Sequence, residues 1–140
     1  MTDPHHLQRF IDAQEMNYRA ALAEITAGRK TSHWMWYVFP QYVGLGFSST
    51  SRHYAIKNLE EGAAYLDHPV LGLRLRECVD AVLAVTGRSA HEIFGSPDDM
   101  KLKSCMTLFA HLSPEGSVFE SVLDQYFDGH RDQKTLELLR

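Results

Sequence analysis

The spacing of apolar residues constrains the fold of this 140-residue chain more than any other feature. In successive segments they recur every three or four positions, which is the pattern of helices that bury one face. The segment 70–85 is the most apolar, and a helix with so few polar positions is usually central in a bundle. The length fits one domain. The sequence therefore predicts an all-α fold, a compact single-domain multi-helix bundle over residues 1–140.

Residues that begin and end helices mark the boundaries of these segments. Asp3 and Pro4 suit the cap and the first position of the first helix, and Gly28 suits its end. Ser96-Pro97 and Ser113-Pro114 give the same start signal to two later helices. The expected helices cover about 4–27, 52–59, 60–67, 70–85, 97–112, 114–128 and a last stretch from 132, with a single turn over 89–94.

One stretch departs from the helical pattern, from His33 to Tyr54, HWMWYVFPQYVGLGFSSTSRHY. Residues 34–38 are apolar on every face, so their periodicity does not distinguish a minor strand from a buried helical turn. Proline at position 40 disfavours helix at Phe39. The glycine- and serine-rich second half is expected to be a loop, with Ser51 capping a short helix after it. We expect the other helices to hold this stretch in place, and a functional site to lie on it.

The loop in this stretch has the composition of an anion-binding turn. Gly44 and Gly46 allow the backbone to turn its N–H groups inward, and a helix that begins near Ser51 adds partial positive charge. Ser48 adds a hydroxyl, and Arg52 adds a guanidinium that can bind two oxygens at once. The third glycine of a dinucleotide fingerprint and the lysine of a P-loop are absent. A tight turn followed by a helix cap explains the same residues, and both interpretations stay open.

The aromatic residues beside the loop are candidates for stacking against a flat ring. Such rings commonly pack in protein cores, but an anion site and a stacking surface close together in the chain would suit a nucleotide-like ligand. Polar residues near the stretch, or interrupting an apolar helix face, complete the prediction. The candidate ligand-binding residues outside the loop are Gln14, His33, Trp34, Trp36, Gln41, Tyr54 and Ser104.

The helix after Ser96 carries a line of polar residues. Lys101 and Ser104 are three positions apart and therefore share one side of that helix. As a functional interpretation, Asp99 and Lys101 reach a cleft as acid and cation, and they are the candidate catalytic residues. Alternatively, this side is a solvated face, and the aspartates in the first turn favour the helix dipole.

Composition and spacing exclude several classes of function. A net charge of −4 and a pI near 6.0 disfavour a binder of bulk nucleic acid. The eight histidines have no metal-ligand spacing, and no GxSxG elbow is present. We therefore expect neither a metal nor a cofactor. The first ten residues lack a basic-then-apolar signal, and no apolar run reaches the roughly 18 residues of a membrane span. The sequence predicts a cytoplasmic protein without membrane contact.

Several motifs along the chain resemble one bacterial family, the helical domains numbered 1810 among domains of unknown function. The resemblance covers nearly the whole chain and implies a small, mainly helical fold. Some members are labelled calpastatin, but an inhibitory calpastatin repeat is disordered, unlike the folded domain expected here. The motifs are Arg9-Phe10, Ala13-Gln14, Ser32-His-Trp-Met-Trp36, Phe39-Pro-Gln41, Gly44-Leu-Gly46, His68-Pro-Val-Leu71, Asp99-x-Lys101 and Met106-Thr-Leu-Phe109.

A more distant resemblance concerns chemistry. The segments Leu66–Leu71, Leu83–Gly87 and His91–Asp99 are similar to NADAR (YbiA-like) domains. Those helical domains act on the N-glycosidic bonds of ribosyl nucleotides and ADP-ribose-type compounds. This chain departs from them after the aspartate, where Met100-Lys-Leu-Lys103 replaces Trp-Gly-x-Gly, and Ala13-Gln14 is all that remains of their Glu-x-Tyr-Tyr-Gln.

Three hypotheses for the function follow. In the first, the chain is an N-glycoside hydrolase or transferase for a ribosyl nucleotide or an ADP-ribose-like ligand. Asp99 would stabilise the oxocarbenium-like sugar, and Lys101 and Arg52 would neutralise phosphate or the leaving group. In the second, the same residues bind a small nucleotide-like or ribose-phosphate-like molecule without turnover. In the third, the rings belong to the core of a structural or protein-interaction domain. The sequence does not predict an oligomeric state.

Overall fold

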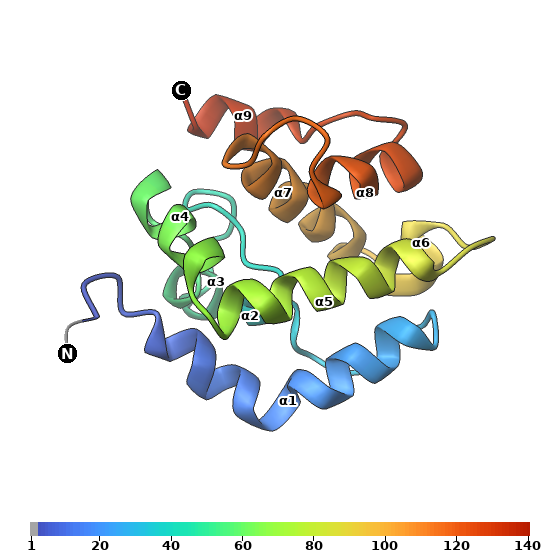
Figure 1. Cartoon of the computed structure of the whole chain (residues 1–140), viewed down its shortest axis with the longest axis horizontal. Coiled ribbons are helices and arrows are strands. Elements are labelled where there is room, and N and C mark those ends of the chain that lie inside the picture. Colours follow the sequence, from blue (N-terminus) through green and yellow to red (C-terminus); the bar gives the residue numbers. More distant parts are fainter. Residues whose placement is uncertain (1–2) are drawn as a thin grey trace.

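The computed structural model describes residues 3–140, and these form an all-α fold, as predicted (Figure 1). Helix α5 (Leu71–Ala84) crosses the middle of the molecule and packs against three others: α1 (Gln8–Thr26), α4 (Leu59–Asp67) and α8 (Val118–Phe127). Helix α7 (Asp98–His111) packs in turn against α8. The shorter helices are α2 (Met35–Val38), α3 (Ser49–His53), α6 (Ala90–Phe94) and α9 (Gln133–Leu138).

The core is continuous and centred on α5 and α7. Because apolar residues recur along α5 at helical spacing, one face of that helix is almost completely shielded from water. The central position predicted for the segment 70–85 is thereby confirmed. Helix α7 contributes a run of buried residues over 104–110 because it is covered on several sides, by α6, α8 and α9. Helix α7 also contributes residues to the cleft described below.

The segment around the tryptophans is a helical turn and not a strand. Helix α2 covers Met35–Val38, so the strand that the sequence left open near residues 34–38 is absent. Within the described residues, β pairing is limited to one isolated parallel bridge between Tyr42 and Ile56. That bridge closes the segment 43–55, which consists of the loop 43–48, called the glycine loop below, and of α3 with the two residues after it. Its hydrogen bonds run from Ile56 N to Gln41 O at 2.8 Å and from Val43 N to Ile56 O at 2.9 Å.

Three helices begin at residues other than those predicted. In α3 and α8 the reason is that a different serine caps the helix. Ser48 caps α3 by accepting a hydrogen bond from the N–H of Ser51, so Ser51 lies inside that helix and is not its cap. Similarly, α8 begins after Ser117 and not at Ser113-Pro114. Helix α1 begins only at Gln8, although Asp3 does bind the N–H groups of residues 7 and 8.

The carboxylate of Glu24 holds the start of the central stretch in place. The Glu24 carboxylate of α1 accepts hydrogen bonds from the backbone N–H groups of Thr31 and Ser32, from the Ser32 hydroxyl and from Trp34 Nε1. Burial alone would raise the pKa of Glu24, but these donors outweigh it and lower the pKa to about 2. The indole of Trp34 is therefore anchored at the core edge through a carboxylate.

Replacing Glu24 with glutamine is expected to destabilise the fold by about 1–2 kcal/mol at neutral pH, a figure reduced because the carboxylate is partly solvated. The lowered pKa means that wild-type Glu24 stabilises the fold fully above about pH 4.3, its ordinary unfolded value, and loses this contribution as the pH falls toward 2. Urea unfolding of both proteins between pH 7 and pH 2 measures this difference. A gap between the two proteins that stays constant over this range would contradict the assignment.

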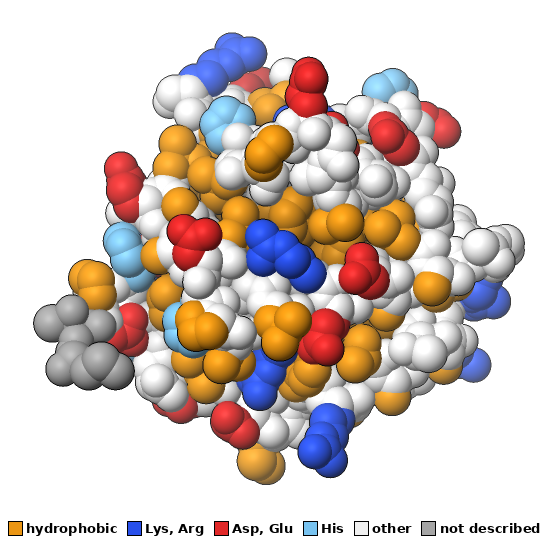
Figure 2. Space-filling model, in the orientation of Figure 1, with side chains coloured by type: hydrophobic (Ala, Val, Ile, Leu, Met, Phe, Trp, Pro, Cys, Tyr) orange, Lys and Arg blue, Asp and Glu red, His pale blue; other side chains and the backbone are white. Residues whose placement is uncertain are grey.

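The surface carries charges of both signs. Figure 2 shows Lys and Arg interspersed with Asp and Glu on the face seen there, without a continuous basic region. Among the helices of residues 3–140, none combines the length and the hydrophobicity that crossing a membrane requires.

Candidate functional site

A cleft of about 380 Å³ lies where the glycine loop, α7 and the start of α9 meet. Its volume falls within the roughly 300–1,000 Å³ that is typical of small-molecule sites. One side is apolar, and the other carries ammonium, amide, hydroxyl and carboxylate groups. We call this hollow the cleft, and its lining residues are Trp36, Gln41, Leu45, Gly46, Pro97, Met100, Lys101, Ser104, Asp132 and Lys134.

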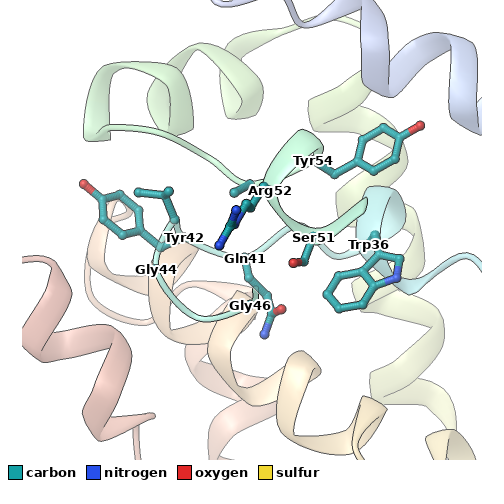
Figure 3. A pocket seen from close by; sticks show the side chains of 10 residues that line it. Trp36, Gln41, Tyr42, Gly44, Gly46, Ser51, Arg52 and Tyr54 are labelled. Atoms are coloured by element: carbon teal, nitrogen blue, oxygen red, sulfur yellow. The ribbon is translucent and has the colours of Figure 1, made fainter. Parts of the chain in front are cut away.

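A second, much smaller hollow lies behind the loop and shares Trp36, Gln41 and Gly46 with the cleft. Its volume of about 20 Å³ is the size of one water molecule. Figure 3 shows Ser51 between the Trp36 ring and the loop, with its hydroxyl on the side of the loop, and the Gln41 amide beside Gly46, whereas the rings of Tyr42 and Tyr54 point away. We call it the inner chamber. Together the two hollows surround the loop on both sides.

Gly46 is required where the loop passes α3. A Cβ at this position would lie 2.6 Å from both Cβ and Oγ of Ser51, and 4.0 Å from the Trp36 ring. Any larger residue would therefore push the loop away from α3. Within the described part of the chain, the backbone N–H groups of Leu45 and Gly46 donate no backbone hydrogen bond, which leaves them available to a ligand.

The cationic side of the cleft is built around Asp98. Its Oδ2 lies 2.8 Å from Lys30 Nζ, and its Oδ1 lies 3.1 Å from Lys101 Nζ. Both lysines also face a tryptophan: Lys30 Nζ is 5.1 Å from the centre of the Trp34 ring, and Lys101 Nζ is 3.6 Å from that of Trp36. Two ammonium groups thus share one carboxylate, and one of them, that of Lys101, lines the cleft.

The charge balance on this side of the cleft favours an additional anion. Burial alone would raise the pKa of Asp98, but the ammonium groups of Lys30 and Lys101 outweigh it and hold the pKa below its ordinary value. Asp98 is therefore ionised at neutral pH and neutralises one of the two lysines. In addition, none of the ion pairs formed by the described residues includes Lys134 or Arg52, which line the cleft and the inner chamber. With Asp132, which also lines the cleft, three lysines face two carboxylates, and Arg52 adds a positive charge at the inner chamber, so positive charge is in excess by a small margin.

A buried arginine connects the loop to the rest of the fold. Arg9 of α1 pairs with Glu61 of α4 at 2.6 Å, and each side chain is only 3% exposed. Its guanidinium also donates to the backbone carbonyls of His53 and Ala55, at 2.7 Å and 3.0 Å. These carbonyls belong to the last residue of α3 and to the second residue after it, so Arg9 fixes the far end of the segment that carries the inner chamber.

Nine of the residues predicted from the sequence line one of the two hollows. Trp36, Gln41, Gly46, Lys101 and Ser104 line the cleft. The inner chamber is lined by Gly44, Ser51, Arg52 and Tyr54, together with the three residues that it shares with the cleft. The sequence therefore identified the loop, one of the two indoles and the polar side of α7 as neighbours in space.

Two predicted residues belong to the core and not to a binding surface. Trp34 is 1% exposed, and its ring packs against Phe39 and Phe94. Gln14 is also 1% exposed, and its amide donates to the carbonyl of Tyr37 and to the hydroxyl of Tyr65. The inward orientation expected for Gln14 is correct, but its partners are protein groups. Neither side chain is available to a ligand in the cleft.

The remaining predicted residues lie outside both hollows. His33 is exposed at the other end of α2, and Ser48 caps α3. Asp99 turns away from Lys101 and lies 3.5 Å from the imidazole of His91. The reason is helical register: Asp98 is three residues before Lys101 and shares its side of α7, whereas Asp99 is two residues before it and does not. Of the two candidate catalytic residues, only Lys101 lines the cleft, and the catalytic role of Asp99 stays a prediction.

Half of the residues that line the cleft were not predicted from the sequence. Leu45, Pro97 and Met100 are neighbours of predicted residues, so proximity in sequence was a signal for them. Asp132 and Lys134 come from the start of α9 and are brought to the loop only by the packing of that helix, in which Leu138 contacts Gly44. The Asp132 carboxylate also caps α9 by accepting from the N–H and the hydroxyl of Thr135.

A larger hollow, of about 540 Å³, lies between the N-terminal segment and α4. Two of its polar side chains are already engaged by backbone N–H groups of the protein. Asp3 accepts hydrogen bonds from two backbone N–H groups, and His68 Nδ1 accepts from those of Val70 and Leu71. Size alone does not make it a site, and the cleft is the better candidate because it is lined by two lysines, of which Lys134 takes part in none of the ion pairs of the described residues.

Comparisons with known proteins agree with the fold and give no activity. A family model described as "Protein of unknown function (DUF1810)" matches residues 4–139. The crystal structure of the conserved hypothetical protein Rv1873 from Mycobacterium tuberculosis is similar, with 50% sequence identity, a TM-score of 0.96 and coverage of 98% of each chain. No curated protein matches this chain.

Proposed function

Because the chain belongs to the family of proteins of unknown function DUF1810, we propose its function from the cleft alone: the binding of a small nucleotide-like ligand that carries an anionic group and a flat ring. The observation that carries this proposal is the cluster of Lys30, Asp98 and Lys101, where two cations share one carboxylate and Lys101 lines the cleft. Lys134 adds a further positive charge to the same cleft. A phosphate or another oxyanion would complete this arrangement.

The other lining groups suit the rest of such a ligand. Trp36 offers an indole face, on which aromatic bases stack irrespective of their identity. The Gln41 amide can both donate to and accept from the edge of a base, and the free N–H groups of Leu45 and Gly46 can bind phosphate or sugar oxygens. The apolar groups of Leu45 and Met100 would cover the uncharged part of the ligand.

Titration with adenosine monophosphate tests the proposal. Lys101→Ala and Lys134→Ala are each expected to weaken binding by about tenfold, which is the effect of losing about 1.4 kcal/mol of charge-assisted hydrogen bonding. Arg19→Ala serves as the control, because this exposed arginine on α1 lies away from the cleft. Calorimetry at low ionic strength gives the dissociation constants. Equal effects of all three substitutions would show that the anion is attracted only by overall charge, and an absence of binding would exclude the function.

One observation favours catalysis as a second candidate. Asp132 is a carboxylate at the cleft itself, where it would lie beside a bound sugar and stabilise the charge that develops when an N-glycosidic bond breaks. Chromatography of nucleotides and ADP-ribose incubated with the protein tests for released base. Asp132→Asn should abolish release but keep the α9 cap, because asparagine is an equally good cap residue. Binding without any released base would leave the ligand-binding function alone.

A further inference from the structure

We infer that Lys101 is a movable cover over the ring-binding face of Trp36, so that the cleft accepts a flat ring well only together with an anion. This inference rests on the proposed binding function and concerns the same site. The Lys101 ammonium lies 3.6 Å from the centre of the Trp36 ring, and both side chains line the cleft. The ammonium therefore occupies the face that a ligand ring in the cleft would use.

Lys101 can leave this position without stranding a buried charge. If Asp98 had Lys101 as its sole partner, moving the lysine would leave the carboxylate uncompensated, which is strongly unfavourable. In this structure Lys30 binds the other oxygen of Asp98 at the shorter distance, 2.8 Å, and its side chain is only 7% exposed. The pair between Lys30 and Asp98 persists when Lys101 moves. Lys30 therefore acts as a positioning residue that frees Lys101 for a ligand.

An anion in the cleft supplies the reason for Lys101 to move. A charge-assisted hydrogen bond to a phosphate oxygen is stronger than a cation–π contact, and the Lys101 side chain, 18% exposed, is accessible from the cleft. When the ammonium turns to the anion, the indole face becomes free for stacking. The site should thus select molecules that carry an oxyanion and a ring together. A nucleoside without phosphate should compete poorly with the ammonium for the indole.

The test measures adenosine binding with and without inorganic phosphate. In the wild-type protein, saturating phosphate is expected to tighten adenosine binding by about fivefold or more, and by reciprocity adenosine tightens phosphate binding by the same factor. Lys101→Ala removes the cover, so adenosine should bind this variant equally well with or without phosphate. Phosphate binding that is unaffected by adenosine in the wild-type protein, or coupling that survives Lys101→Ala, would overturn the inference and leave the proposed function intact.

Tryptophan fluorescence reports the movement itself. Trp34 is 1% exposed and contributes a constant, shielded signal, so quenching by acrylamide reports mainly on Trp36. Phosphate alone should increase quenching in the wild-type protein, and Trp36→Phe should abolish this response. Unchanged quenching while calorimetry shows bound phosphate would mean that Lys101 stays on the ring, which overturns the inference. Failure of phosphate to bind at all would instead overturn the proposed function, and the inference with it.

Discussion

Replacing Arg9 with methionine is expected to destabilise the protein by about 3–5 kcal/mol, the largest effect of any single substitution considered. The guanidinium is buried, pairs with Glu61 at 2.6 Å and donates to four backbone carbonyls, those of His5, His6, His53 and Ala55, at 2.7–3.0 Å. Methionine donates nothing, so the carboxylate would lose its charged partner and each of the four carbonyls would lose one hydrogen-bond donor.

Chemical denaturation measures this loss, and two further variants make it specific. Arg19→Met, an exposed arginine of the same helix, should change the free energy of unfolding by less than about 0.5 kcal/mol. The double variant Arg9→Met/Glu61→Gln should be more stable than the sum of the two single effects implies, because glutamine no longer leaves an unpaired charge. A loss of stability for Arg9→Met no larger than that for Arg19→Met would contradict the role given to this arginine.

Replacing Gly46 with alanine is expected to weaken the binding of adenosine monophosphate by about tenfold to a hundredfold, equivalent to the roughly 1–3 kcal/mol that overpacking costs. The added methyl group would lie 2.6 Å from the Cβ and Oγ of Ser51. Helix α3 and the loop must then move apart, which displaces Trp36, Gln41 and the free N–H groups relative to Lys101.

A compensating change separates this steric effect from a general loss of stability. In the double variant Gly46→Ala/Ser51→Gly the two clashing atoms are absent, and affinity should return at least in part. Calorimetric titration of the wild-type, single and double variants gives the comparison. Full affinity in Gly46→Ala would show that this loop does not contact the ligand.

The fold was predictable because most of its signals are local. Apolar spacing located the long helices, and it identified α5 as central, since so few of its positions are polar. The beginnings of helices were less predictable, because Ser48 and Ser51 are both plausible caps, as are Ser113 and Ser117. The choice between such serines depends on where the preceding chain comes from, which is a property of the tertiary structure.

The same difference between local and tertiary signals explains why only part of the candidate site was predicted. In a strand, Trp34 and Trp36 would share one face. In a helix, side chains two positions apart point in directions that differ by roughly 200°. Because the segment is helical, Trp34 enters the core and Trp36 reaches the cleft. Asp98 could have been identified from its spacing to Lys101, but Asp132 and Lys134 could not, because only the packing of α9 brings them to the loop.

A crystal structure of the protein with adenosine monophosphate would locate the ligand. We expect it in the cleft, with its phosphate within hydrogen-bonding distance of Lys101 and Lys134 and its base on the Trp36 ring, while Lys30 stays paired with Asp98. A cleft that stays empty at saturating ligand, or a ligand bound in the larger hollow beside Asp3 and His68, would contradict this expectation.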